Sequence, residues 1–260
     1  MSDRFIFNLS SSTAKGLRST NEDAHWVGTN KKNQCLAIVC DGIGSQDDSQ
    51  IASLITVDVF KKLFLKRSFI CNGEKFFKRC LEKAYKAISK QSTSNLNNKK
   101  IGTTLVMILI TGNKGEVYNL GDSRLYDYSL EDNQWTQITQ DHNLYNHFVN
   151  MKEKDPSIDI NKLCLNYKDQ LFALTKCLES NGNTHHDWDK FKIELHEGDV
   201  IFLATDGVYY FIKPEQVNEI IKRCSNNFET VAKNIIDVAL ANKSNDNLTA
   251  IVVECLKDNG

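Results

Sequence analysis

The sequence predicts an α+β domain in which sheets and helices form separate layers. Strand-like segments are followed by two helical segments, then by more strands, and at the end by further helices and a last strand, an order that differs from a regular βαβ repeat. Apolar residues make up 41% and charged residues 25%, which is ordinary globular usage. A domain of 260 residues can bury about 70–75% of its unfolded surface. We therefore expect a core that needs no disulfide staples.

The first half of the chain supplies one strand and two helices with clear signals. Residues 34–40 form an apolar run that ends at an Asp-Gly pair, which predicts a strand entering a turn. Residues 48–66 and 74–90 carry apolar side chains at helical spacing, so each predicts an amphipathic helix. The polar, Asn-rich residues 92–100 predict a loop.

A strand-rich block follows in the middle of the chain. Residues 103–110 are apolar and β-branched, and residues 111–115 have the composition of a hairpin turn. Three further short strands are expected, at 116–120, 124–128 and 135–138.

The last third begins with a polar stretch, residues 141–172, which has little strand character and predicts a mobile excursion from the core. Two strands, two helices and a final strand are expected after it. Pro214 suits the first turn of one of these helices. The expected ranges are 191–195, 200–204, 214–223, 228–240 and 248–255.

Charge and hydropathy exclude several classes of protein. Lysine and arginine number 32 against 33 acidic residues, which argues against a dedicated nucleic-acid binder but leaves room for a local basic patch. The longest apolar run, residues 105–110, is far shorter than the roughly 20 residues of a membrane-spanning helix. The start of the chain has no signal-peptide pattern. We expect a cytoplasmic protein with no membrane partner.

The eight cysteines predict neither a zinc site nor a disulfide framework. No two of them have CxxC spacing, and a chain without a signal peptide is expected in a reducing compartment. They are therefore interpreted as buried free thiols.

Acidic residues beside turns carry the functional argument. Each of these turns alone is common, because Asp, Asn and Gly favour turns for backbone reasons. Asp41 and Asp206, however, both follow strongly apolar strands, so they are expected at the rim of the core. Carboxylates that converge there repel one another unless cations neutralise them, and all-oxygen ligands favour Mg²⁺, Mn²⁺ or Ca²⁺. The five acidic motifs are Asn21-Glu22-Asp23, Asp41-Gly42-Ile43-Gly44, Gly121-Asp122-Ser123-Arg124, Thr205-Asp206-Gly207 and Asn245-Asp246-Asn247.

Two further motifs lie among these five along the chain, and all seven together resemble a known family. The two are Gly102-Thr103-Thr104 and Ile138-Thr139-Gln140-Asp141-His142. The seven segments are similar, in order, to the successive motifs of the metal-dependent protein phosphatases of the type 2C class, in their short bacterial-like form. The resemblance spans residues 16–254. It implies a four-layer sandwich, with two antiparallel β-sheets packed face to face and flanked by helices. It also implies one phosphatase domain over residues 1–260, with a flap-like insertion at about 143–172.

The resemblance further implies two Mn²⁺ or Mg²⁺ ions and, as in bacterial members, a third, weaker one. Their ligands would be Asp41 bridging the first two ions, Asp206 and Asp246 on the first, Glu22 and the carbonyl of Gly42 on the second, and Asp122 with Asp206 on the third.

For catalysis, the resemblance implies that a water shared by the two ions attacks phosphorus in line. Asp23 would orient this water and Arg18 would bind the phosphate as a bidentate fork. His142 is interpreted as structural. Two departures from the family pattern are a flap without the usual bacterial sequence and the aromatic pair Tyr209-Tyr210, interpreted as either a substrate-facing surface or core.

The leading hypothesis is therefore a serine/threonine protein phosphatase whose partners are a phosphoprotein substrate and its cognate kinase, acting as a monomer. The alternative is a catalytically weak or dead relative that binds phosphoproteins. A third reading is a regulatory phosphatase that acts on one small phosphoprotein. A metal-dependent nuclease is disfavoured, since no basic stripe accompanies the acidic cluster.

Overall fold

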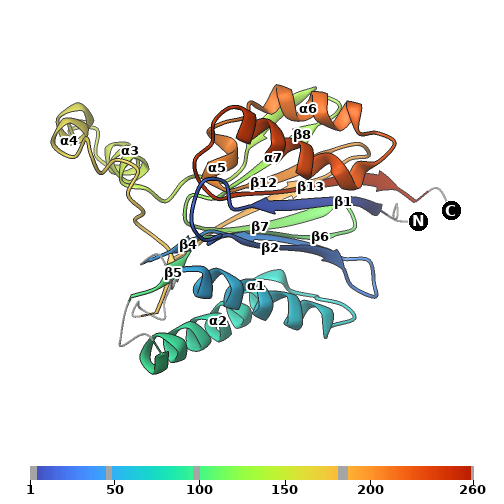
Figure 1. Ribbon diagram of the computed structural model, residues 1–260, viewed down its shortest axis with the longest axis horizontal. Coiled ribbons are helices and arrows are strands. Elements are labelled where there is room, and N and C mark those ends of the chain that lie inside the picture. The colour runs from blue at the N-terminus through green and yellow to red at the C-terminus, as the bar shows by residue number, and fades with distance from the viewer. Residues whose placement is uncertain (1–4, 45–48, 96–99, 181–186, 259–260) are drawn as a thin grey trace.

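The computed structural model describes residues 5–44, 49–95, 100–180 and 187–258, and its main body is a sandwich of two antiparallel sheets with helices on both outer faces (Figure 1). The predicted α+β four-layer arrangement is thereby confirmed. The first sheet has the order β1 (Phe5–Ala14), β13 (Leu248–Lys257), β12 (Val200–Ala204), β8 (Arg124–Ser129) and β9 (Gln134–Gln137). The second has the order β11 (Asp189–Glu194), β7 (Lys114–Leu120), β6 (Leu105–Thr111), β3 (Cys35–Cys40) and β2 (Ala24–Thr29).

Helices cover each sheet on the side away from its partner. α1 (Ser49–Leu65) and α2 (Gly73–Asn95) lie on the second sheet, and α6 (Pro214–Arg223) and α7 (Val231–Ala241) lie on the first. A short 3₁₀ turn (Phe228–Thr230) precedes α7. A small third sheet, β10 (Leu178–Glu179), β5 (Gly102–Thr103) and β4 (Gly42–Ile43), lies at one end of the sandwich.

The central strands are buried on both faces, which explains their continuous apolar runs. In β3, Val39 faces the layer between the sheets whereas its neighbour Ile38 packs under α1 and α2. In β13, Ile251 and Val252 divide in the same way between the inter-sheet layer and the layer under α7. Alternation of side chains across each strand therefore builds three apolar layers from two sheets.

Several element boundaries differ from the expected ones. α2 continues to Asn95 through part of the expected loop, because Ser92 is fully buried and tertiary contacts outweigh the polar sequence. The expected strand over 103–110 is two strands, β5 and β6, that belong to different sheets and meet at Thr104. Asp48, the expected start of α1, and residues 96–99 of the expected loop lie outside the described residues.

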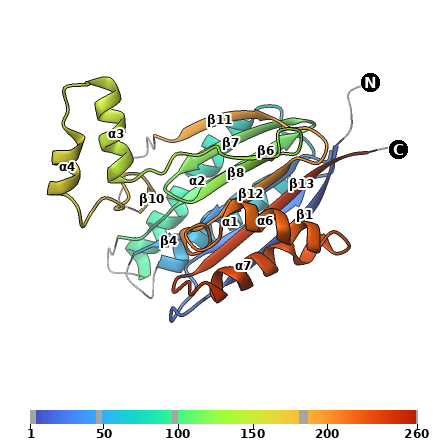
Figure 2. The same cartoon turned by 90° about the horizontal axis from the view of Figure 1, so that it is seen from above.

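Residues 143–172 form an excursion from the sandwich, and they contain two helices that the sequence analysis did not predict (Figure 2). α3 (Leu144–Lys154) and α4 (Ile160–Asn166) begin at Asn143 and Asp159, whose side chains accept backbone N–H groups as helix caps. The two ends of the excursion are joined by the hydrogen bonds from Leu144 N to Ala173 O and from Tyr145 N to Leu171 O.

The eight cysteines are free, as expected, but not all are buried. Cys35, Cys40, Cys80 and Cys255 are buried, whereas Cys71 is exposed in the turn between α1 and α2. No helix in the described part of the chain is long and apolar enough to cross a membrane.

Candidate metal and phosphate site

The chemistry-bearing residues meet in a cavity of about 640 Å³ at the end of the sandwich where β3 and β12 stop. Seven of the eight residues singled out from the sequence line it. They are Arg18, Glu22, Asp41, Gly42, Asp122, Asp206 and Asp246. Asp23 is not among the residues that line the cavity, and Asn247, to which the sequence analysis gave no role, is.

Asp41 leaves β3 and is fixed by Thr104. Its backbone N–H donates to Thr104 Oγ1 at 2.9 Å, and Thr104 N donates back to the Asp41 carbonyl at 2.8 Å. The Thr104 hydroxyl also shares a 2.7 Å hydrogen bond with Ser123. One threonine therefore ties the turn of Asp41 to the turn that carries Asp122.

Gly42 is required by the close approach of two other chain segments. A Cβ atom at this position would lie 2.5 Å from the Ser49 carbonyl oxygen and 2.7 Å from that of Glu22. Gly42 N also donates to the Glu22 carbonyl at 3.1 Å. The absence of a side chain thus lets Glu22 lie directly beside the Asp41 turn.

Asp206 and Asp246 come from neighbouring turns of the first sheet. Asp206 opens the one-turn helix α5 (Asp206–Tyr209) directly after β12, and Asp246 precedes β13. Gly207 permits their approach, because a Cβ atom added at this position would clash with the Asn247 carbonyl oxygen, at 2.0 Å. Arg18 reaches across from the N-terminal loop, with its Nη2 at 2.6 Å from Asp246 Oδ2, and this hydrogen bond raises the Arg18 pKa.

Asn247 holds the N-terminal loop in place. Its side-chain oxygen accepts the N–H of Glu22 at 2.8 Å, and its amide donates to the carbonyls of Lys15 and Thr20 at 2.9 and 2.8 Å. One buried side chain thus satisfies three backbone groups around Arg18 and Glu22. The sequence pair Asp246-Asn247 could have indicated this role. A buried asparagine beside an acidic turn can accept a hydrogen bond from a backbone N–H and donate hydrogen bonds to backbone carbonyls.

Asp23 is buried behind the cavity. Its Oδ2 accepts a hydrogen bond from Thr205 at 2.9 Å, and its Oδ1 is buried without a hydrogen-bond partner in the described structure. Burial raises the pKa of this carboxyl to about 7, against the opposing effect of hydrogen bonds from Thr249 and Thr205. An unsatisfied buried carboxylate oxygen beside an acidic cavity is suited to binding a water or a cation.

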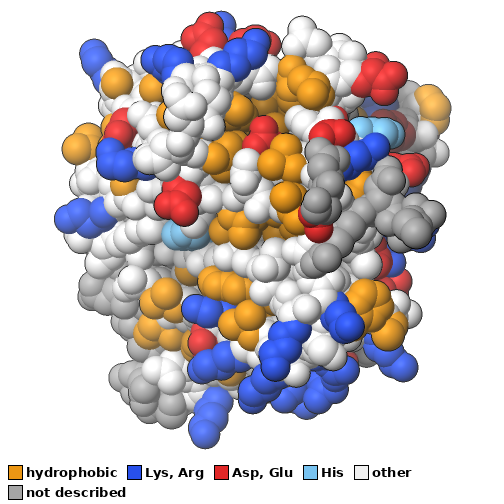
Figure 3. Space-filling model, turned by 90° about the vertical axis from the view of Figure 1, so that its right-hand side faces the viewer, with side chains coloured by type: hydrophobic (Ala, Val, Ile, Leu, Met, Phe, Trp, Pro, Cys, Tyr) orange, Lys and Arg blue, Asp and Glu red, His pale blue; other side chains and the backbone are white. Residues whose placement is uncertain are grey.

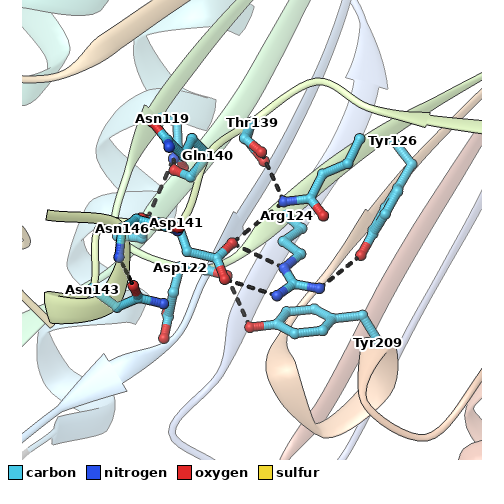
Figure 4. Close-up of polar contacts among 12 residues, drawn as sticks. Asn119, Asp122, Arg124, Tyr126, Thr139, Gln140, Asp141, Asn143, Asn146 and Tyr209 are labelled. Atoms are coloured by element: carbon cyan, nitrogen blue, oxygen red, sulfur yellow. Dashed lines mark hydrogen bonds and ion pairs between the residues drawn. The ribbon is translucent and has the colours of Figure 1, made fainter. Parts of the chain in front are cut away.

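A second polar network supports Asp122 (Figure 4). Arg124 forms a bidentate pair with Asp141, at 2.9 and 2.8 Å, and its guanidinium lies 3.9 Å from the centre of the Tyr209 ring. The Tyr209 hydroxyl donates to the Asp122 carbonyl at 3.0 Å. Tyr209 is therefore core, whereas its neighbour Tyr210 is 55% exposed.

His142 is placed as a structural residue. Its Nδ1 accepts the N–H of Gly121 at 3.0 Å, which puts the ring proton of the neutral form on Nε2, 3.0 Å from Asp189. His142 N donates to the Gly121 carbonyl as well. The ring thus braces the glycine before Asp122.

The electrostatics of the cavity favour a bound cation. Burial, together with the neighbouring carboxylates, raises the pKa of Asp41 and Asp206, and raises that of Asp122 to about 7. The side-chain atoms that could bind a metal ion are all carboxylate oxygens, the ligand type that Mg²⁺ and Mn²⁺ prefer. No group of three or more His, Cys, Asp or Glu side chains among the described residues is arranged to hold a metal ion. The carboxylates thus line one cavity without forming a ready-made cluster around a single point.

The chain is similar to known protein phosphatases in sequence and in fold. The family model described as "Protein phosphatase 2C" matches residues 14–249. A putative protein phosphatase of Mycoplasma genitalium is 29% identical, over 98% of this chain and 96% of its own. The structure of the serine/threonine phosphatase Stp1 from Staphylococcus aureus has a TM-score of 0.80 and 26% identity, covering 98% of this chain and 97% of that one. The catalytic domain of the phosphatase PstP in complex with two manganese ions has a TM-score of 0.75 at 22% identity, covering 97% and 99%.

Proposed function

Because the chain belongs to the protein phosphatase 2C family, we propose that it hydrolyses phosphoserine and phosphothreonine in proteins, with the acidic cavity as its active site. The chain is a serine/threonine protein phosphatase by family. The observation that carries the proposal is the meeting of five carboxylates and Arg18, from segments far apart in the sequence, in one cavity.

Two divalent cations, Mn²⁺ or Mg²⁺, are proposed as cofactors. Their ligands would be Asp41, Asp206 and Asp246 with Glu22 and the carbonyl of Gly42, and Asp122 with Asp206 would take a third ion. When bound, such ions lower the pKa of water and neutralise charge on the transferred phosphoryl group.

The chain's own residues would bind and orient the substrate. Arg18 lies at the cavity with its side chain 55% exposed, and its contact with Asp246 uses one of the five N–H donors of a guanidinium. The planar fork matches two phosphate oxygens, which a lysine does not. Asp23, held by Thr205 behind the cavity, would accept a hydrogen bond from the attacking water with its unpaired oxygen.

The whole chain is proposed to be one phosphatase domain, and residues 143–172 a flap. Phe172 and Leu174 at the return of the excursion line the active-site cavity, so a change in the excursion reaches the substrate. The partners would be a phosphoprotein and the kinase that modifies it.

The deciding experiment is phosphate release from a phosphothreonine peptide with Mn²⁺ and with EDTA. We expect metal-dependent hydrolysis that falls about a thousandfold or more in Asp206→Asn, since a ligand carboxylate is lost. Asp237→Asn, on the exposed face of α7, removes a carboxylate that does not line the cavity and should be fully active. A folded protein that hydrolyses nothing with any divalent metal would instead support the phosphoprotein-binding alternative.

A further inference from the structure

The helical layer of α1 and α2 carries a concentration of positive charge that the net charge of the chain conceals. Residues 61–90 hold ten Lys and Arg against two Glu, whereas the other 230 residues hold 22 against 31 acidic residues. Lys and Arg side chains crowd the lower part of the face in Figure 3, with hydrophobic side chains between them. This is the side on which the α1–α2 layer lies in Figure 1.

On α2, the charge is confined to the outward face. Its inward positions, such as Phe77 and Ala84, belong to the core. Between Lys75 and Lys90, every exposed position of the helix is charged, and all but Glu82 are basic. The basic set is Lys75, Lys78, Arg79, Lys83, Lys86 and Lys90.

A face that only has to be solvated gains stability from mixed charges at i,i+4 spacing. Here Lys75 and Arg79, Arg79 and Lys83, and Lys86 and Lys90 place like charges at that spacing. Each such pair of like charges destabilises the helix. An anionic ligand on this face would relieve that repulsion.

Exposed apolar side chains accompany the charge. Leu65 is 48% and Phe69 is 46% exposed, on either side of Lys66 and Arg67 where α1 ends. Phe69 also lines a groove of about 550 Å³ together with Arg67, Lys75 and Arg79. A phosphate-rich ligand alone would not use these apolar groups, whereas the interface of a lipid bilayer would.

The α1–α2 turn, which carries Phe69, is hydrogen-bonded to the β2–β3 hairpin, and this hairpin is also basic. The side chain of Gln34 donates to the Ile70 carbonyl at 2.9 Å and accepts the Ile70 N–H at 2.7 Å. Gln34 closes the β2–β3 hairpin, whose tip carries the exposed Lys31 and Lys32. The hairpin and the α1–α2 turn therefore present a single rigid basic edge.

We propose that this basic face, formed by α2, the α1–α2 turn and the β2–β3 hairpin, binds the surface of a membrane rich in anionic phospholipids. α2 alone is about 34 Å long, so the charge is spread over a surface broader than one peptide would cover. Basic side chains attract anionic headgroups, and Phe69 and Leu65 enter the boundary between headgroups and acyl chains. Among the described residues, none that lines the active-site cavity belongs to α1 or α2, so the cavity stays open.

The sequence predicted no membrane partner, because no segment is long enough to span a bilayer. Peripheral binding needs no such segment, since clustered basic side chains and a few apolar ones suffice. The proposal is independent of the chemistry of the active site.

The first test is sedimentation of the full chain with phosphatidylcholine vesicles, with and without about 30% phosphatidylglycerol. We expect binding only to the anionic vesicles, weakened by raising the salt from about 50 to 300 mM as the Debye length shortens. Equal binding to both vesicles, or to neither, would overturn the proposal.

The second test removes charge from the face. Lys75→Gln, Arg79→Gln and Lys83→Gln together should weaken binding about a hundredfold, since each basic side chain near an anionic surface contributes roughly a factor of five. The matched control is Lys222→Gln, Arg223→Gln and Lys233→Gln, which removes equal charge from α6 and α7 on the other sheet and should bind normally. Equal losses in both triple variants would mean that net charge alone drives binding and would refute the assignment of this face.

The third test separates a membrane from other polyanions. Phe69→Ser keeps the charge and should weaken vesicle binding about tenfold, because an inserted aromatic ring is lost. Unchanged vesicle binding by this variant, together with tight binding of an RNA homopolymer, would reassign the face to nucleic acid. Hydrolysis of a soluble phosphopeptide and the thermal midpoint should be the same for all variants, so failure here would leave the phosphatase assignment intact.

Discussion

The carboxylates of the proposed active site are held by single side chains that bridge loops, and Asn247 is one of these side chains. It connects the turn of Asp246 to the loop that carries Arg18 and Glu22 through three hydrogen bonds. The acidic residues that line the cavity could be predicted from the sequence, because each lies beside a turn in a recognisable motif. Their convergence could not be derived from residue spacing. Asp41 and Asp206 follow strands of different sheets, and only the stacking of the sheets brings them together.

Asn247→Ala should weaken both structure and catalysis. Three backbone groups lose their partner inside the protein, so we expect a loss of about 2–3 kcal/mol in the free energy of unfolding. Phosphopeptide hydrolysis should fall by about tenfold or more, since Arg18 and Glu22 lose their support. Urea unfolding and steady-state kinetics measure the two effects.

The matched control is Asn242→Ala. Its exposed side chain makes a single hydrogen bond, to the Phe211 carbonyl. This variant should stay within about 0.5 kcal/mol of the parent and keep full activity. An Asn247→Ala protein that behaves like it would contradict the bridging role.

Asp127 on β8 is a half-buried carboxyl whose charge should destabilise the protein at neutral pH. Burial and the nearby Asp199 raise its pKa to about 6, while His196 opposes the rise. Its Oδ1 is buried without a hydrogen-bond partner in the described structure. A raised carboxyl pKa favours the neutral form in the folded state, so the stability it contributes is present below about pH 4 and is lost as the pH rises through 6.

Asp127→Asn should therefore stabilise the protein at pH 8 by about 1 kcal/mol, a value reduced from the full shift because the group is only partly buried. The gain should be much smaller at pH 4, where the parent carboxyl is neutral in the folded state and already partly protonated in the unfolded state. Urea unfolding at the two pH values measures the change. The exposed Asp169→Asn should show no such pH dependence, and a gain at pH 4 equal to that at pH 8 would refute the assignment.

At the scale of elements, strongly periodic segments were predicted and weakly patterned ones were missed. α1, α2 and the buried strands follow from their apolar patterns, as predicted. β1 and β2 were not predicted, because their side chains are largely half-buried or exposed and their sequence alternates weakly. Their pairing with β13 and β3 is a long-range property that no local pattern reports.

α3 and α4 were missed because they bury little. Phe148 is the one buried residue of α3, and α4 has none. Phe148 packs against Tyr167 just after α4, with ring centres 5.6 Å apart. Capping hydrogen bonds and this aromatic contact hold the excursion together, and neither was recognised in the sequence.

Phe148→Ala should loosen the excursion without unfolding the sandwich. Hydrogen exchange across residues 143–172 is expected to accelerate by about tenfold or more, while amides of β3 and β6 keep their protection. The comparison variant is Phe60→Ala, which removes a fully buried core ring and should lower the global free energy of unfolding by about 3–5 kcal/mol. Equal loss of protection everywhere in Phe148→Ala would show that the excursion unfolds with the core.

At the scale of the whole molecule, the two helical layers share one inter-sheet core, which favours a single cooperative unit. Each layer contains its own tryptophans: Trp26 and Trp188 lie under α1 and α2, and Trp135 lies under α6 and α7. The layers can thus be followed separately by fluorescence.

Two variants isolate these probes. Trp135→Phe reports only the α1–α2 layer, and Trp26→Phe with Trp188→Phe reports only the α6–α7 layer. The fluorescence midpoint of each variant is compared with the circular-dichroism midpoint of the same variant. A change in stability caused by the substitution then affects both midpoints equally. We expect fluorescence and circular dichroism to give coincident urea transitions in both variants. Fluorescence midpoints that depart from circular dichroism in opposite directions would show two units and contradict the single-domain proposal.

The pairing of β1 with β13 has a consequence for the timing of synthesis. Phe5 lies opposite Lys257 and Ala14 opposite Leu248, so β1 pairs with a strand that is synthesised long after it. A ribosome must therefore complete β13 before the first sheet can close, and long-range pairing of this kind slows folding. Asp246 and Asn247 directly precede that strand. A nascent chain that has not reached β13 accordingly lacks part of the proposed active site.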